Sequence, residues 1–296
     1  MFYLFTRRAY FAAKSNFTNR PAGLTRYLRL SASGDGIHSG HAINRDNWLS
    51  EALASARTPD ILIFVHGYNT SQSSLLLRHA MLQQKLAQNG FKGTIVSFDW
   101  PSDGSNLSYL ADRNEAKAVA NALLTDGILM FLAQAPKHRV HILAHSMGTY
   151  LTLRALSAGG RWAVEQVIFT AADVDSDWMK SGAWGSLVMQ HRCKQFTNFH
   201  NTRDEVLILS KNMFNRGAAR AGLDGLPGQI PKSYRDVYCT EQYKTRVAAP
   251  TMIRSHNWYF EDVGFYRDLA LTLAGTAADQ MPTRVATNTG GQALYA

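Results

Sequence analysis

Short apolar runs alternate with longer helical patterns from about residue 59 onward. This alternation is typical of a parallel β-sheet whose strands are joined by crossover helices. The run DILIFV at Asp60–Val65 is apolar at almost every position, as expected for a strand buried on both faces. A helical pattern follows over Thr70–Gln88, with leucines along one face, and Gly90 ends it. The pattern therefore predicts an α/β fold with a mostly parallel central sheet and helices on both faces.

The same alternation continues along the chain. Further strands are predicted at Gly93–Phe98, Arg139–Ala144, Glu165–Ala171 and Lys194–Phe199, with a weaker candidate at Val237–Glu241. Further helices are predicted at Asp46–Arg57 (with Asp46 as the cap), Asn114–Gln134, Ser146–Ala158 and Asp262–Ala274. We interpret residues 59–275 as one core on this basis.

The segments outside this alternation are expected to have simpler structures. Residues 1–58 are interpreted as an N-terminal extension, with an edge strand MFYLFTRR, a basic surface loop and the short helix. Residues 276–296 lack periodicity and are expected to form a flexible tail. Residues 176–193 and 211–235 show no clear strand pattern. We interpret them as loop insertions and candidate lids, because long loops in a compact core are usually functional.

Composition narrows the class of protein. Of the 296 residues, 46% are hydrophobic and 18% are charged, which is typical of a globular chain and excludes a disordered one. The two cysteines, Cys193 and Cys239, exclude a disulfide framework and suit a reducing compartment. No run approaches the roughly 18 apolar residues of a transmembrane helix. We expect a cytoplasmic protein, although the basic N-terminus leaves organelle targeting open.

The net charge of +9 raises the question of an anionic partner. The basic residues are spread along the chain and no nucleic-acid recognition motif accompanies them, so no nucleic-acid partner is expected. A solvated basic surface is the simplest interpretation, with an anionic substrate or a membrane surface as alternatives. No glycine-rich nucleotide motif occurs, and His138 and His141 would face opposite sides of a strand. We therefore expect no cofactor and no metal.

The most informative motif is Ala144-His145-Ser146-Met147-Gly148, at the junction of a predicted strand and helix. This is the setting of a nucleophile elbow, whose usual pattern is G-x-S-x-G; here Ala144 replaces the first glycine. Backbone N–H groups at the start of the helix favour a developing negative charge. Ser146 is therefore the predicted nucleophile, the alternative being an ordinary turn with a capping serine.

A second motif, His66-Gly67-Tyr68-Asn69, directly follows the first buried strand. In an esterase-type site such a loop donates one backbone N–H to the oxyanion hole, and the residue after the serine donates the other. These donors are predicted to be the backbone amides of Tyr68 and Met147. Gly67 would permit the backbone geometry. The side chain of His66 is interpreted as a structural group that holds the loop, not as the base.

A serine nucleophile needs a base and an orienting carboxylate, in the chain order Ser, Asp or Glu, His. Asp204, which follows the predicted strand Lys194–Phe199, is the predicted acid. A helix cap is the alternative role for Asp204, and Asp173 is the alternative acid. His256 is the predicted base because no other histidine lies beyond position 200.

Two tryptophans are candidates for the substrate pocket. Trp100 follows the strand Gly93–Phe98 and would line an acyl pocket or pack at its rim. Trp178 lies in the first insertion, where it would form an apolar lid with Trp184 and Met189, or pack in the ordinary way.

Taken together, five segments resemble the bacterial α/β-hydrolases of unknown function. They are the HGYN loop, the FDWPSDG turn at Phe98–Gly104, the AHSMG elbow, and the NTRDEVL and SHNWY segments, within residues 60–270. The resemblance implies an α/β-hydrolase fold and matches Ser146, Asp204 and His256 to the positions of a catalytic triad. It implies no substrate.

The site residues predict a serine hydrolase that acts through an acyl-enzyme. The usual activity of the fold, not the residues themselves, favours carboxylic esters, so a small ester or acyl substrate is expected. Two alternatives remain open at this point. One is a non-catalytic binding protein on the same fold, and the other is an acyltransferase or thioesterase that uses the same triad. The acyl chain length and the oligomeric state do not follow from the sequence.

Overall fold

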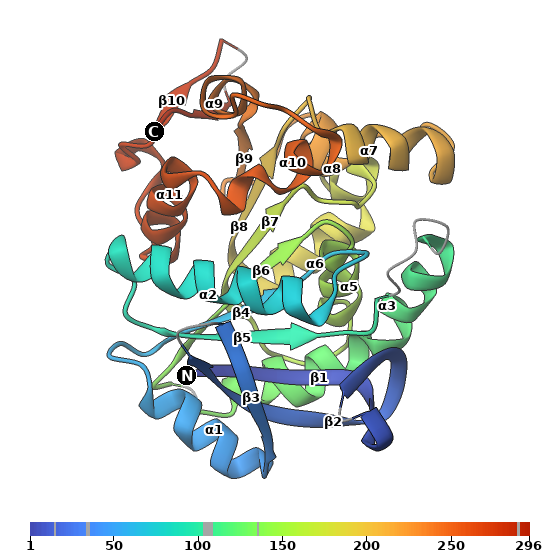
Figure 1. Cartoon of the computed structure of the whole chain (residues 1–296). Coiled ribbons are helices and arrows are strands. Elements are labelled where there is room, and N and C mark those ends of the chain that lie inside the picture. The colour runs from blue at the N-terminus through green and yellow to red at the C-terminus, as the bar shows by residue number, and fades with distance from the viewer. Residues whose placement is uncertain (15, 34–35, 103–108, 135, 289–290) are drawn as a thin grey trace.

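The computed structural model describes residues 1–14, 16–33, 36–102, 109–134, 136–288 and 291–296, and centres on one 11-stranded sheet (Figure 1). The strands are β1 (Phe2–Phe11), β2 (Asn16–Ser33), β3 (Gly36–Ile43), β4 (Asp60–Val65), β5 (Thr94–Asp99), β6 (Arg139–His145), β7 (Val164–Thr170), β8 (Cys193–His200), β9 (Tyr234–Tyr238), β10 (Arg284–Ala286) and β11 (Gln292–Leu294). Their order is β10-β11-β9-β8-β7-β6-β4-β5-β1-β2-β3.

The sheet is mostly parallel, as predicted. Strands β1, β5, β4, β6, β7, β8, β9 and β11 pair in parallel, whereas β1–β2, β2–β3 and β10–β11 are antiparallel. Strand β4 lies between β5 and β6, so the chain crosses to opposite sides of β4 in successive connections. Ligands of open α/β sheets bind beyond the carboxyl ends of the strands at such a switch point. The loops that follow β4 and β6 meet there.

The helices lie between these strands. They are α1 (Arg45–Ala54), α2 (Gln72–Gln88), α3 (Tyr109–Leu123), α4 (Leu129–Leu132), α5 (Met147–Leu156), α6 (Trp184–Arg192), α7 (Glu205–Leu209), α8 (Ala221–Asp224), α9 (Thr240–Arg246), α10 (Met252–Asn257) and α11 (Val263–Leu273). Shorter helical turns are η1 (Ala12–Lys14), η2 (Leu124–Ile128), η3 (Ser176–Met179), η4 (Ser210–Phe214), η5 (Trp258–Phe260) and η6 (Ala278–Gln280). No helix in the described part of the chain is long and apolar enough to cross a membrane.

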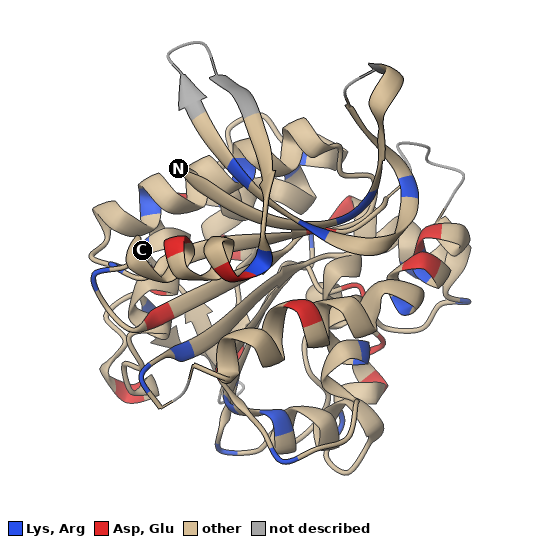
Figure 2. Ribbon diagram, turned by 90° about the horizontal axis from the view of Figure 1, so that it is seen from below, with Lys and Arg blue, Asp and Glu red and all other residues tan. Residues whose placement is uncertain are grey.

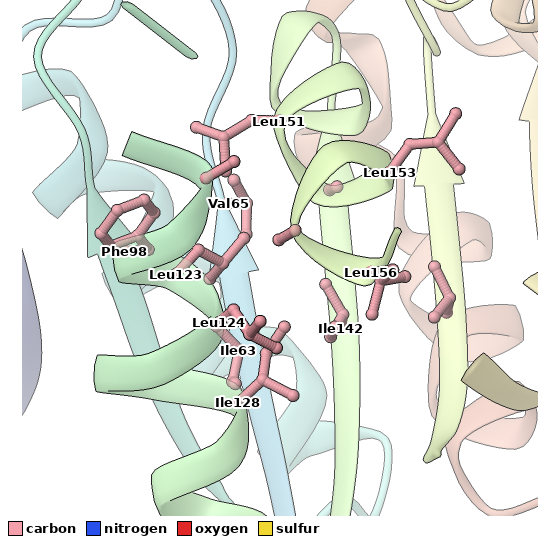
Figure 3. Packing of buried hydrophobic residues seen from close by; sticks show 14 of the residues in the cluster. Ile63, Val65, Phe98, Leu123, Leu124, Ile128, Ile142, Leu151, Leu153 and Leu156 are labelled. Atoms are coloured by element: carbon pink, nitrogen blue, oxygen red, sulfur yellow. The ribbon is translucent and has the colours of Figure 1, made fainter. Parts of the chain in front are cut away.

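Two hydrophobic clusters cover the two faces of the sheet. Strand β4 shows the division, because Ile61, Ile63 and Val65 belong to one cluster and Leu62 and Phe64 to the other. The first cluster includes buried residues of α3 and α5, and the second includes those of α2 and α11. Figure 3 shows Ile63 and Val65 packed beneath side chains of the first cluster. A strand covered on both faces explains the uninterrupted apolar run.

The N-terminal segment differs from the prediction. Strand β1 is not at the edge of the sheet but lies between β5 and β2, and the expected basic loop is the long strand β2, followed by β3. Many side chains of β2 are exposed or half-exposed, so polar and charged residues are tolerated along it. This is why its sequence carries no apolar run.

The C-terminal segment is also more ordered than expected. Within residues 276–296, β10 and β11 form an antiparallel pair, and β11 extends the sheet beside β9. Leu294 is buried, and Arg284 pairs with the buried Asp268 of α11 through contacts of 2.6 and 2.8 Å. The segment is therefore not a loose tail over its described residues.

The two predicted insertions contain helices. Residues 176–193 hold η3 and α6, and residues 211–235 hold the rest of η4, the helix α8 and the beginning of β9. The weak strand candidate Val237–Glu241 corresponds to β9, which begins three residues earlier. Figure 2 shows lysines and arginines distributed over many elements, with acidic residues among them.

Candidate active site

Ser146 occupies a strained turn between β6 and α5. Its backbone has φ 55° and ψ −129°, a conformation that residues other than glycine rarely adopt and that costs about 1–3 kcal/mol. The turn is held on both sides, because the Ser146 N–H donates to Thr170 O at 3.1 Å and Ser146 O accepts from the N–H of Thr149 at 3.0 Å. Such a conformation persists only where the surrounding structure enforces it.

Two glycines let the segments around Ser146 approach one another closely. A Cβ on Gly148 would lie 2.3 Å from the carbonyl oxygen of His66, and a Cβ on Gly67 would lie 2.6 Å from Cβ of Ser146. Any larger residue at either position would push the loop after β4 away from the elbow. The glycines of the two sequence motifs thus both allow the loop after β4 and the elbow to lie in contact.

Asp204 and His256 are brought together from two separate elements. Nδ1 of His256, in α10, lies 2.7 Å from Oδ2 of Asp204, and both side chains are buried. The other carboxylate oxygen of Asp204 accepts the N–H of Leu207 at 2.9 Å and caps α7. With Nδ1–H donated to Asp204, Nε2 of His256 is left as a proton acceptor. His256 lies within the short helix α10.

His145 links the elbow to α10, the helix that carries His256. Its Nε2 lies 3.1 Å from the carbonyl oxygen of His256, and the two imidazole rings are 4.7 Å apart, edge to face. Because a carbonyl accepts hydrogen bonds, Nε2 carries the proton. Burial and the neighbouring His256 hold the pKa of His145 well below its usual value, so the ring is neutral. His256 is therefore placed beside the residue that precedes Ser146.

The loop after β4 is fixed by its first residue. The ring of His66 is fully buried and stacks on Trp100, with ring centroids 5.2 Å apart. The Trp100 backbone N–H donates to Nε2 of His66 at 3.2 Å, and Nδ1 of His66 lies 2.8 Å from Gly67 O. Burial lowers the pKa of His66 and keeps its ring neutral. These contacts favour the structural role expected for this histidine.

The two amides predicted to form the oxyanion hole are carried by elements that touch. Met147 begins α5, so its N–H is one of those that have no acceptor within the helix. Tyr68 directly follows Gly67, and its ring lies 6.0 Å from that of Tyr109. Asn69, the next residue, has φ 51°, which asparagine tolerates better than most residues. The loop therefore turns sharply beside the elbow.

Asp173, the alternative acid, is engaged in a different network. Its carboxylate accepts hydrogen bonds from Ser210 Oγ at 2.8 Å and from Tyr109 Oη at 2.9 Å, and pairs with Arg220 at 3.1 Å. All four side chains are buried. The backbone N–H of Asp173 donates to Ser146 O at 3.3 Å, so this network borders the elbow. Asp173 contributes support here, while Asp204 is the acid in contact with His256.

The two candidate pocket tryptophans have different surroundings. Trp100 is fully buried, and its Nε1 donates to His66 O at 2.9 Å, which favours packing beneath the loop over a place in an open acyl pocket. Trp178 is half-buried, 6.1 Å from the ring of Tyr150 on α5 and 5.4 Å from that of Trp184. It thus remains a candidate for a pocket wall. Of the FDWPSDG motif, Asp103 and Gly104 lie outside the described residues.

Sequence reasoning missed Arg8, which is buried beneath the same loop. Its guanidinium contacts Asp99 at 2.6 Å and the carbonyl oxygen of Thr70 at 2.7 Å. The sequence offered one signal, the isolated charge of Asp99 at the end of the apolar run Gly93–Phe98. A charge at such a position needs a partner, but nothing local identifies which basic residue supplies it.

A cavity of about 930 Å³ lies away from Ser146, beside β9 and the β10–β11 pair. It contains another histidine–aspartate pair, His200 and Asp236, at 3.2 Å. The described residues that line it include neither a serine nor a cysteine, and Asp236 also accepts hydrogen bonds from Asn198 and from the N–H of Leu226. Within the described lining of this cavity, the pair therefore has no serine or cysteine beside it, and Ser146 remains the candidate nucleophile. Among the described residues, no three potential metal ligands cluster.

Comparisons with solved structures find similar folds at low sequence identity. XC6422 from Xanthomonas campestris, described as an α/β serine hydrolase without a lid, is 14% identical with a TM-score of 0.37, over 87% of this chain and 89% of that one. The α/β hydrolase domain-containing protein 10 from mouse is 12% identical with a TM-score of 0.41, over 85% and 93%. An acetylxylan esterase is 15% identical with a TM-score of 0.38, over 74% and 98%.

Sequence comparisons are more decisive. The uncharacterized protein alr1448 of Nostoc sp. (strain PCC 7120) is 39% identical over 61 residues, which is 21% of this chain and only 16% of that relative. The model of the family described as α/β hydrolase of unknown function (DUF900) matches residues 41–230, more than half of the chain. The match agrees with the mostly parallel sheet and its covering helices. The chain has the α/β-hydrolase fold and belongs to this family of α/β hydrolases of unknown function.

Proposed function

We propose that this hydrolase is a serine hydrolase that cleaves carboxylic esters, with Ser146 as nucleophile, His256 as base and Asp204 as the orienting acid. The observation that carries the proposal is the strained backbone of Ser146 at the turn from β6 into α5. Strain of this kind is retained at functional sites, where it holds the hydroxyl at the carboxyl edge of the sheet. An ordinary capping serine would not require it.

The proposed reaction proceeds in two steps. Nε2 of His256 accepts the proton of the Ser146 hydroxyl while its oxygen attacks the carbonyl carbon, and the backbone N–H groups of Tyr68 and Met147 hold the oxyanion. His256 then protonates the departing alcohol, leaving an acyl group on Ser146. Water, deprotonated by the same nitrogen, releases the acid. Asp204 accepts the hydrogen bond of Nδ1–H throughout, at the 2.7 Å contact, and stabilises the charged ring without taking its proton.

An ester is the proposed substrate because of the chemistry of the site. Two backbone N–H groups suit a neutral carbonyl that gains one negative charge. A single histidine can protonate the leaving group of an ester or of an amide, but the ester is the less demanding of the two because its leaving group departs more easily. The acyl chain and the alcohol are not specified by this chemistry.

The test is labelling with a fluorophosphonate probe, read by intact mass. We expect one adduct on the wild type and none on Ser146→Ala. The matched control is Ser157→Ala, which removes another serine at the opposite end of α5. It should label like the wild type. Absence of an adduct on a folded wild type, or an adduct that persists in Ser146→Ala, would contradict the proposal and favour a non-catalytic binding protein or another nucleophile.

A second measurement separates hydrolysis from acyl transfer. Short p-nitrophenyl esters are incubated with wild-type enzyme that reacts with the probe, with and without a simple alcohol as acceptor. We expect release of the free acid at a rate independent of the alcohol. Accumulation of a new ester at the expense of the acid would instead assign the site to an acyltransferase.

A further inference from the structure

We propose that Arg8 and Asp99 are positioning residues that hold the oxyanion loop, defined here as residues 66–70, against Ser146. This inference rests on the function proposed above. It concerns a residue from the N-terminal strand, outside residues 41–230 to which the family model corresponds. The N-terminal hairpin would then be part of what makes the site work, rather than an appendage to the core.

The register of the sheet places Arg8 at the carboxyl edge, level with the oxyanion loop. Strand β1 pairs in parallel with β5 and Thr6 lies opposite Asp99, the last residue of β5. Because β1 continues beyond that point, Arg8 reaches the carboxyl edge of the sheet, where the oxyanion loop leaves β4. Its side chain is only 1% exposed.

The guanidinium of Arg8 holds three segments at once. Nε donates to Asp99 Oδ1 at 2.6 Å, Nη2 donates to Thr70 O at 2.7 Å, and Nη1 donates to Asn19 Oδ1 of β2. The planar guanidinium has five N–H donors in a fixed arrangement, which a lysine cannot reproduce. Arg8 therefore fixes the last residue of the oxyanion loop relative to both β5 and β2.

Asp99 orients the guanidinium of Arg8 beside the loop. Its Oδ2 accepts hydrogen bonds from Thr6 Oγ1 at 2.9 Å and from Gln72 Nε2 at 3.0 Å, so both oxygens are occupied. Oδ1 also lies 3.6 Å from Nε2 of His66, the first residue of the loop. The loop is thus held at His66 by Trp100, and at Thr70 by Arg8, which Asp99 holds in place.

Between these two ends lie the residues that touch the nucleophile. Gly67 is in contact range of Ser146, Tyr68 carries the proposed oxyanion donor, and Asn69 has a positive φ of 51°. An oxyanion donor must lie about 2.7–3.1 Å from the charge that develops. A misplacement of about 1 Å can lower a rate by about 100-fold. Loss of the Arg8–Thr70 contact should therefore affect the transition state more than the binding of substrate.

The experiment measures steady-state hydrolysis of p-nitrophenyl acetate together with thermal unfolding. In Arg8→Lys we expect kcat to fall by about 10- to 100-fold, with KM changed by less than about threefold, because the oxyanion forms only in the transition state. The matched control is Arg29→Lys, on β2, which weakens a half-exposed ion pair with Glu51 away from the loop. Its kcat should equal that of the wild type.

A double variant separates positioning from folding. Arg8→Met with Asp99→Leu removes both buried charges, and replacement of a buried pair by apolar residues often restores stability. We expect its melting temperature to exceed that of Arg8→Met alone. Its kcat should stay low, because the carbonyl oxygen of Thr70 no longer accepts a hydrogen bond from Arg8. Hydrogen exchange at the amides of residues 66–70 provides a readout independent of activity, and should be faster in each Arg8 variant.

The outcomes are distinguishable. A wild type without Ser146-dependent hydrolysis would contradict the proposed function, while hydrogen exchange would still decide whether Arg8 holds the loop. Wild-type kcat, or unchanged loop exchange, in a folded variant without the Arg8–Thr70 contact would overturn the positioning role alone. Failure of all Arg8 variants to fold would assign the network to stability and would also overturn it.

Discussion

At the scale of one residue, Asp204 combines two roles that the sequence offered as alternatives. A helix cap and an orienting acid were alternatives for this position, yet its Oδ1 caps α7 and its Oδ2 contacts His256. A carboxylate has two oxygens, so one residue serves both contacts. The capping contact also restricts the rotation of the carboxylate and keeps Oδ2 directed at His256.

Replacement of Asp204 by asparagine should separate these contacts. Asp204→Asn retains an oxygen for the cap, so the free energy of unfolding should change by less than about 1 kcal/mol. Its amide favours the wrong tautomer of His256, and kcat should fall by about 10⁴, the loss seen for this change in a serine protease triad. The measurements are urea unfolding and ester hydrolysis.

The control for this change is Asp262→Asn, the same substitution at the cap of α11. It should keep the wild-type kcat, since Asp262 caps a helix without touching His256. A near-normal kcat in Asp204→Asn would mean that another carboxylate orients the base, and Asp173 would be tested next.

At the scale of the element, strands were easier to predict than the segments between them. Strand β4 has the predicted bounds, and β5, β6, β7 and β8 differ by a residue or so at their ends. Burial on two faces favours apolar residues, which gives a strong local signal that is clearest in the nearly uninterrupted run of β4. The short helix α10 gave no such signal, because it has room for only a turn and a half of pattern.

Helix starts depend on a single side chain and were predicted less well. Helix α1 is capped by Asn44, whose side chain accepts the N–H of Asp46, rather than by Asp46 itself. Both residues are good caps, so composition alone did not decide between them.

The starts of β4 and β6 are joined by a carboxylate whose pKa makes stability depend on pH. Burial alone would raise the pKa of Asp60, but hydrogen bonds from His141, Arg139 and Thr58 lower it to about 2. Because the pKa is lower in the folded state, the ionised Asp60 stabilises the folded protein, and this contribution is fully present above the unfolded pKa of 3.8. The contribution is lost as the pH falls through the folded pKa of about 2.

We therefore expect Asp60→Asn to lower the free energy of unfolding by about 2 kcal/mol at neutral pH. The difference from the wild type should shrink as pH falls from 4 to 2, because the wild type then loses the same contribution. Urea unfolding at several pH values measures this. Asp46→Asn, at an exposed position on α1, is the control. A difference that stays constant with pH would show that Asp60 acts through packing.

At the scale of the whole molecule, the two ends of the chain complete the sheet. Strands β1, β2 and β3 extend it beyond β5, and β11 and β10 extend it beyond β9. The predicted core of residues 59–275 supplies only the middle of this sheet. The C-terminal strands are fixed by the ion pair of Arg284 with Asp268, in which the side chains are 3% and 0% exposed.

Removal of Arg284 should consequently destabilise the whole molecule. Arg284→Met leaves the carboxylate of Asp268 buried without its cation, and we expect a loss of about 3–5 kcal/mol in the free energy of unfolding. The control is Lys211→Met, which breaks a partly exposed pair with Asp224 and should lose less than about 1 kcal/mol. Urea unfolding compares the two. Similar small losses would mean that the C-terminal strands contribute little to the fold.

The sequence by itself determined the parallel core, the fold class and the segments in which the candidate chemistry lies. These features follow from local patterns, since periodicity and turn residues act within about ten positions of the chain. Only the tertiary structure decided which distant residues meet, such as His256 with Asp204, 52 positions apart, and Arg8 with Asp99, 91 positions apart. Such contacts depend on the order and register of strands in the sheet. A strand pattern does not specify its neighbours, so β1 was expected at an edge, whereas its place beside β5 is what carries Arg8 to the oxyanion loop.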